Sequence, residues 1–153
     1  MAASDQLTRS SRGLVPAARN AAKGLNAAIC AKFPEAAKID IAAWDQYLTV
    51  GFVWAALSAL RAKETPATAI EEVKTIVADS LSRAFPEGVK ALDHCTLFMS
   101  QTTGGDEKIG VDDALGYWIV WNLLGRDDFT EDEDKIVRIL GNIAIKEFAS
   151  FWP

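Results

Sequence analysis

Apolar residues in this chain recur mostly at helical spacing, and two stretches are apolar on every side. Residues 41–60, IAAWDQYLTVGFVWAALSAL, carry no charge between Asp45 and Arg61. A helix that is apolar all round is either a membrane span or the buried centre of a helical domain. The uncharged run at 47–60 is shorter than the roughly 18–20 residues that a bilayer requires. We therefore predict a buried central helix here, and a second one at 113–124, DALGYWIVWNLL.

Four further segments carry a single apolar face and predict amphipathic helices, at about 16–31, 66–84, 86–101 and from 131 to the chain end. Residues that favour helix starts precede the central helix and two of these segments: Asp40 before residue 41, Thr65 with Pro66, and Thr130 with Glu133 as a capping box. No stretch is convincing as a strand. We predict an all-α, single-domain bundle of about six helices over residues 14–153, preceded by a flexible N-terminal tail at 1–13.

The chain contains a weak internal repeat. KFPEAAK at 32–38 resembles AFPEGVK at 84–90, and LTVGFVWAAL at 48–57 resembles LGYWIVWNLL at 115–124. The alternative is chance similarity between helix-rich segments. A true duplication would make Trp54 and Trp121 equivalent and would pack the two apolar helices together.

Charge and cysteine content limit the possible partners. The first 34 residues carry five basic side chains and one acidic one, a net charge of +4. Because the whole chain has a net charge of −5, the remaining residues carry −9. An acidic body disfavours nucleic acid and anionic membranes as partners. Cys30 and Cys95 are too few for a disulfide framework or a zinc site and suit a reducing, cytoplasmic compartment. The Arg- and Ser-containing start lacks the apolar core of a secretory signal; a frayed tail explains it better than an organellar transit peptide.

Candidate catalytic and metal-binding groups are few. His94 is the only histidine, so a Ser-His or Cys-His pair would have to use it. Its helical position places it on the polar surface, where substitution by Ala should change stability by less than about 0.5 kcal/mol. The acids at 127–134 lack the glycine and glutamate positions of a calcium loop and suit a helix start. We predict no catalytic residue, no metal and no cofactor.

One long stretch, QTTGGDEKIGVD at 101–112, has no helical periodicity. It lacks the GxxxxGK[ST] spacing of a phosphate-binding loop, and it is longer than most connections between helices. The simpler alternative is that this stretch only connects two helices. If it has a function, we predict that it binds a protein partner. The predicted partner-binding residues are Thr102, Thr103, Gly104, Gly105, Asp106, Glu107 and Lys108.

Five tryptophans and two tyrosines supply a second candidate site. Core packing explains most of them, and each buried indole N–H then needs an acceptor. The alternative is an aromatic-lined pocket between the two central helices for a flat or apolar ligand. The predicted lining residues are Tyr47, Trp54, Tyr117 and Trp121.

These patterns favour a non-enzymatic helical interaction or assembly module. Its partner would be another protein or a second copy in a homodimer, because Ala18, Ala21 and Ala28 form a stripe that permits close approach. The alternative is a carrier or sensor of a small aromatic or apolar ligand held between the central helices. An enzyme that uses carboxylates, with His94 as a further candidate group, ranks third.

Overall fold

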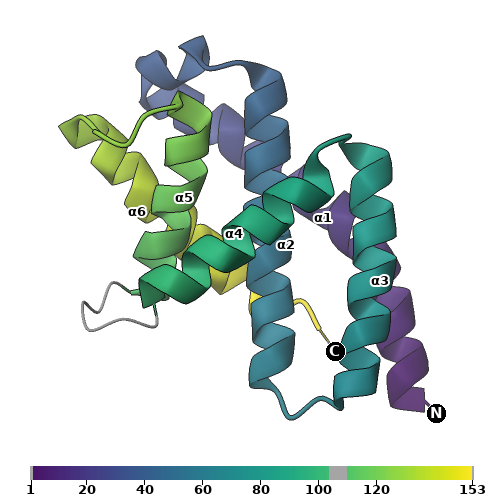
Figure 1. Ribbon diagram of the computed structural model, residues 1–153. Helices are drawn as coiled ribbons and strands as arrows, with labels where there is room; N and C mark the ends of the chain where they lie inside the picture. Colours follow the sequence, from purple (N-terminus) through teal and green to yellow (C-terminus); the bar gives the residue numbers. More distant parts are fainter. Residues whose placement is uncertain (1, 104–109, 153) are drawn as a thin grey trace.

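The computed structural model describes residues 2–103 and 110–152, and every regular element in that part of the chain is helical (Figure 1). The predicted all-α bundle of six main helices is confirmed, and a short 3₁₀ helix, η1, adds a further element. The elements are α1 (Ala2–Lys32), η1 (Pro34–Lys38), α2 (Ile41–Ala62), α3 (Ala67–Ala84), α4 (Gly88–Thr103), α5 (Val111–Leu124) and α6 (Glu131–Phe148).

Helix α2 lies at the centre of the bundle, with α1 behind it, α4 across its front and α5 and α6 on one side (Figure 1). Residues 48–53 are all buried. Neighbouring side chains on a helix point about 100° apart, so this run covers the whole circumference. The helix begins where the sequence predicts, because the Asp40 carboxylate accepts a hydrogen bond from the Ala42 N–H at 3.1 Å. The prediction of a buried central helix is confirmed.

Helices α5 and α6 meet backbone to backbone. A Cβ atom placed on Gly116 would lie 1.9 Å from the carbonyl oxygen of Val137, and one on Gly141 would lie 1.8 Å from the carbonyl oxygen of Asp112. Only glycine leaves room for so close an approach. The two glycines therefore fix how α5 crosses α6.

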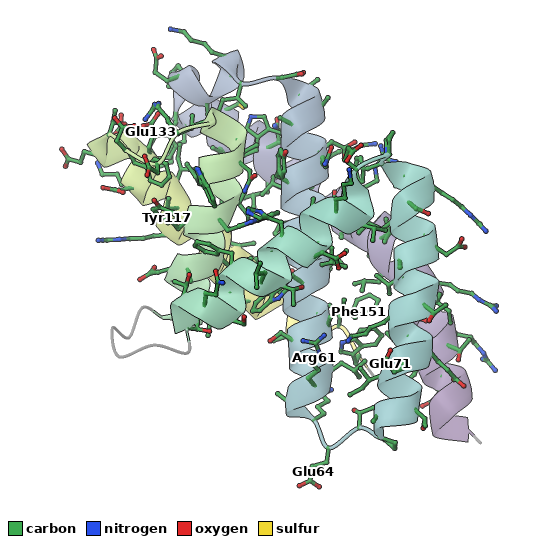
Figure 2. All side chains as sticks on the ribbon, in the orientation of Figure 1. Arg61, Glu64, Glu71, Tyr117, Glu133 and Phe151 are labelled. Carbon is green, nitrogen blue, oxygen red and sulfur yellow. The ribbon has the colours of Figure 1, made fainter. Side chains whose placement is uncertain are left out.

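The C-terminal segment returns to α2. The Phe148 ring stacks on Phe52 at 5.0 Å between centroids, and Trp152 Nε1 donates a hydrogen bond of 2.6 Å to the Ala56 carbonyl. The segment passes between α2 and α3, where Phe151 also lies (Figures 1 and 2). The buried Trp152 side chain thus covers the surface of α2 at Ala56.

Helix α1 begins earlier than predicted. It starts at Ala2 and includes residues 2–13, which we expected to form a flexible tail. Ser11 and Leu14 are buried, because α1 packs along α2 and α3. Pro16 lies inside the helix and removes one backbone hydrogen bond; burial of the residues around it outweighs that loss.

The alanine stripe of α1 mostly serves this packing. Ala18 is buried and Ala21 is partly buried against the core, whereas Ala28 is exposed. The stripe that we expected to face a second copy therefore contacts its own chain over most of its length.

Helix starts follow the sequence at α6 but not at α3. At α6 the predicted capping box is present: the Thr130 hydroxyl accepts from the Glu133 N–H at 3.2 Å, and Glu133 Oε1 accepts from the Thr130 N–H at 2.8 Å. Before α3, the predicted cap Thr65 instead donates its hydroxyl proton to the Leu60 carbonyl at 3.2 Å. Helix α3 starts one residue later, after Pro66.

The two Phe-Pro-Glu corners share their local hydrogen bonds. The N–H of Phe33 donates to Ile29 and that of Phe85 donates to Leu81, at 2.8 and 2.9 Å. The elements after the corners differ, since the first leads into η1 and the second into α4. Helices α2 and α5 do pack together, with Ile119 against Gly51. Duplication of the two halves stays a prediction.

The glycine crossing generates a stability prediction. Gly141→Ala should lower the free energy of unfolding by about 3 kcal/mol or more, because the new methyl group meets backbone that cannot rotate away. Gly24→Ala is the matched control, since it lies in α1 with open space around it. We expect it to stabilise the chain by about 0.5–1 kcal/mol. Urea unfolding would measure both changes, and equal effects would contradict the proposed role of the crossing.

Candidate functional site

Two of the predicted partner-binding residues belong to a helix. Thr102 and Thr103 belong to the last turn of α4, where the Thr103 hydroxyl donates to the Met99 carbonyl at 2.6 Å. The other predicted residues, Gly104, Gly105, Asp106, Glu107 and Lys108, lie outside the described residues. Partner binding at this loop stays a prediction.

Three of the four predicted ligand-lining residues belong to one aromatic cluster. Tyr47 contacts Trp118 edge to face, with ring centroids 5.8 Å apart, and Tyr117 stacks on Phe98 at 6.0 Å. Trp121 lies 5.9 Å from the same Phe98 ring. The rings of Tyr117 and Trp121 therefore pack on Phe98 of α4, whereas the sequence predicts them around a pocket between the two central helices.

The fourth predicted residue, Trp54, is half-buried on α2 and joins no ring contact within the described residues. Tyr47 does line a pocket of about 290 Å³, shared with His94, Trp118 and Asn122. The predicted quartet thus does not form a single site.

His94 has a structural partner that the sequence does not reveal. Its side chain is exposed, but its Nδ1 accepts a hydrogen bond of 2.9 Å from Nε1 of Trp118, which is fully buried in α5. The imidazole also lies 5.5 Å from the Trp121 ring. The prediction that His94 lies on the surface is confirmed, and its imidazole also supplies the acceptor that the buried indole N–H needs.

A deeper cavity lies where α2 begins, α5 ends and α6 begins; we call it the end cavity. The helix ends that line it lie toward the top of Figure 1, and Glu133, one of its lining residues, is labelled in Figure 2. Its volume is about 420 Å³. Its apolar lining consists of Phe33, Pro34, Ala36, Ile39, Trp44, Val120, Leu123, Leu124 and Ile136.

We call these apolar lining residues the floor of the end cavity. No polar side-chain atom of the floor lacks a hydrogen-bond partner. Trp44 is 1% exposed, and its Nε1 donates to the Ala36 carbonyl at 3.3 Å. Within the described residues, the buried side-chain atoms without a hydrogen-bond partner belong to Asn26 and Thr49, and neither residue lines this cavity. Water inside would therefore find few partners on the floor.

The rim of the end cavity is charged. Its charged residues are Lys32, Glu35, Arg126, Asp132 and Glu133. Arg126 Nη2 lies 2.6 Å from Glu133 Oε2, and this hydrogen bond is the main reason why the pKa of Glu133 is lowered and that of Arg126 is raised. Glu133 thus stays ionised and holds the connection between α5 and α6 against the first turn of α6.

A wider groove runs between α1 and α3. Its volume is about 930 Å³, and it combines aliphatic side chains with arginines. Arg19 pairs with Asp45 at 2.7 Å, and its guanidinium lies 4.9 Å from the centre of the Phe85 ring. Its lining residues are Arg12, Val15, Pro16, Arg19, Thr75, Ile76, Asp79, Ser80, Arg83 and Ala84. We call it the arginine groove.

Other chemistry is limited in the part of the chain that the structure describes. Cys95 is buried, and burial raises the pKa of its thiol, so the reactive thiolate is disfavoured. Among residues 2–103 and 110–152, no three His, Cys, Asp or Glu side chains come together as metal ligands. No helix in these ranges is long and apolar enough to cross a membrane.

Sequence reasoning missed the end cavity, although one signal was available. Apolar Phe33, Ala36 and Ile39 recur every three residues in the connection before the central helix. That spacing places side chains on one side of a 3₁₀ turn. Such an apolar face is stable when it is buried against neighbouring helices. Here the connection packs next to Trp44 and lines the same cavity.

Comparison with known proteins adds no relative: no family model matches the chain, and neither curated proteins nor solved structures give a significant match.

The bond between Trp118 and His94 can be tested by a double-mutant cycle. His94→Leu should lower the free energy of unfolding by about 1–3 kcal/mol, because it leaves the Trp118 N–H without an acceptor. In a Trp118→Phe background the same substitution should cost much less, since no donor remains. Urea unfolding of the four chains gives the coupling, and equal losses in both backgrounds would exclude the bond as the cause.

Proposed function

We propose that this chain is a binding protein, a carrier or sensor, for a small, flat, apolar ligand held in the end cavity. One observation carries the proposal: a cavity of about 420 Å³ with an apolar floor lies between the beginning of α2 and the end of α5. Sites for small molecules commonly measure 300–1,000 Å³ and combine such a floor with a few polar groups.

The chemistry of the floor supports a flat apolar ligand. Phe33 and Trp44 contribute aromatic rings to the cavity, and Leu123, Leu124 and Ile136 contribute aliphatic surface. Aromatic rings pair favourably with a flat ring system beyond the area that they bury. Because the Trp44 N–H is already bonded to Ala36, the ligand needs no acceptor for it.

The proposal modifies the sequence-based alternative in its residues. It keeps a ligand between the central helices but replaces the predicted Tyr47, Trp54, Tyr117 and Trp121 with Trp44 and its neighbours. A cytoplasmic location belongs to the proposal as well, favoured by the free thiols Cys30 and Cys95.

Filling the cavity should abolish binding. Leu124 lines it and is only half-buried, so Leu124→Trp should occupy the space with little effect on melting temperature. The measurement is isothermal titration calorimetry with 2-naphthoate and its neutral analogue 2-naphthamide. We expect at least one of them to bind the parent chain with a negative change in heat capacity.

Leu97→Trp is the matched control, because Leu97 is an exposed leucine of α4 outside the cavity. It should bind like the parent chain. Binding that survives Leu124→Trp, or the absence of binding by both compounds, would refute the proposal.

A second candidate function, the interaction module favoured by the sequence, draws support from the arginine groove. Its lining includes three arginines and one aspartate, net +2, in a chain whose total charge is −5. Arg83 pairs with Asp79 at 2.8 Å, whereas Arg12 has no ion pair within the described residues. Aliphatic Val15 and Ile76 line the same groove. An acidic amphipathic helix of a partner protein complements both features.

A pair of designed peptides tests this second candidate. One is an amphipathic helix of Leu, Ala and Glu, and the other replaces every Glu with Lys. Fluorescence anisotropy should detect binding of the acidic peptide alone, weakened by Arg12→Glu and by added salt. Arg138→Glu, an exposed arginine of α6, is the control with the same charge change. Equal weakening by both substitutions, or self-association in place of peptide binding, would exclude the groove as the docking site for an acidic partner helix.

A further inference from the structure

The charges around the end cavity are unequally paired. Two of its carboxylates pair with lysines just outside the cavity: Glu35 with Lys38 at 2.9 Å, and Asp132 with Lys135 at 3.7 Å. Both of these pairs are neutral, so neither leaves a free charge at the rim.

The third pair also satisfies its members. Arg126 bonds to Glu133 and donates a second hydrogen bond to the carbonyl of Asp128. Glu133 accepts from the Thr130 N–H in addition. A charged ligand would have to displace one of these partners in order to pair with Arg126 or with Glu133.

Lys32 is the exception among the charged residues of the rim. It has no ion pair within the described ranges 2–103 and 110–152. Its Nζ lies 5.6 Å from the centre of the Phe33 ring, and Phe33 itself lines the cavity. The ammonium group therefore sits at the edge of the apolar floor, beside an aromatic wall. Its position in the last turn of α1 also suits the helix dipole. Lys32 is exposed, so its ammonium donors face water and a ligand can replace that water.

We propose that the ligand of the end cavity is an apolar acid, whose flat body contacts the floor and whose carboxylate pairs with Lys32. This inference rests on the proposed function. An anion meets an unpaired ammonium group here, whereas a cationic ligand would compete with Lys38, Lys135 and Arg126 for carboxylates that are already paired. A charge-assisted hydrogen bond beside an apolar surface is stronger than one in open water.

The same two compounds test the inference. In the parent chain 2-naphthoate should bind roughly fivefold tighter than 2-naphthamide, the upper range for a partly exposed charge pair. Lys32→Met should remove this preference while leaving the affinity for 2-naphthamide unchanged. Lys23→Met changes the net charge equally and Lys23 is an exposed lysine of the same helix, but it does not line the cavity and, in the described part of the chain, pairs with no carboxylate of the rim; this variant should keep the preference. Added salt should reduce the preference in the parent chain.

The outcomes separate the two proposals. Equal binding of both compounds by the parent chain, abolished by Leu124→Trp, would overturn the anionic ligand and leave the binding function standing. A preference that Lys23→Met removes as fully as Lys32→Met would also overturn it, because net charge would then be the cause. Absence of binding by both compounds, or binding that survives Leu124→Trp, would overturn the binding function itself.

Discussion

The backbone contact between α5 and α6 at Gly116 and Gly141 sets the geometry of one half of this molecule. The connection after α5 is short, so the two helices run in opposite directions from their crossing, and the end of α5 lies beside the beginning of α6. This arrangement brings Leu124 and Ile136 to the same cavity and places the Arg126–Glu133 ion pair at its rim. A wider separation of the helices would move the α6 wall of the end cavity away from its α5 wall.

The other walls of the cavity depend on the segment that connects α1 to α2. After the Phe33-Pro34 corner the chain makes only a short 3₁₀ helix, which is too small to fill the space beside the first turns of α2. The hydrogen bond from Trp44 to the Ala36 carbonyl joins that short helix to α2. At the second Phe-Pro-Glu corner the longer α4 follows, and its rings pack on α5. Similar corners thus lead to a cavity of about 420 Å³ in one half and to a cluster of rings beside a smaller pocket of about 290 Å³ in the other.

Aromatic residues have different roles in these two places. In the cluster of α4 and α5 each ring has another ring against it, and the polar edge of Trp118 is satisfied by His94. In the end cavity Trp44 is nearly fully buried with its N–H satisfied, and half-buried Ile39 and Leu124 leave apolar surface accessible to the cavity. A ligand site requires unfilled volume next to satisfied polar groups. This requirement, rather than the number of aromatic residues, distinguishes the end cavity from the cluster.

The sequence by itself determined the helices, because periodicity, caps and Pro and Gly positions act over a few residues. It predicted the central helix from Ile41, the capping box at Thr130 and the end of the second apolar helix at Leu124. Tertiary structure decided where α1 begins, since the burial of Ser11 and Leu14 against other helices extends it past Pro16. It also decided which tryptophan meets a cavity. Spacing along one helix predicts the face on which a side chain lies, but it does not predict which residues lie opposite that face. In this chain the facing residues depend on how closely α5 and α6 approach each other at Gly116 and Gly141.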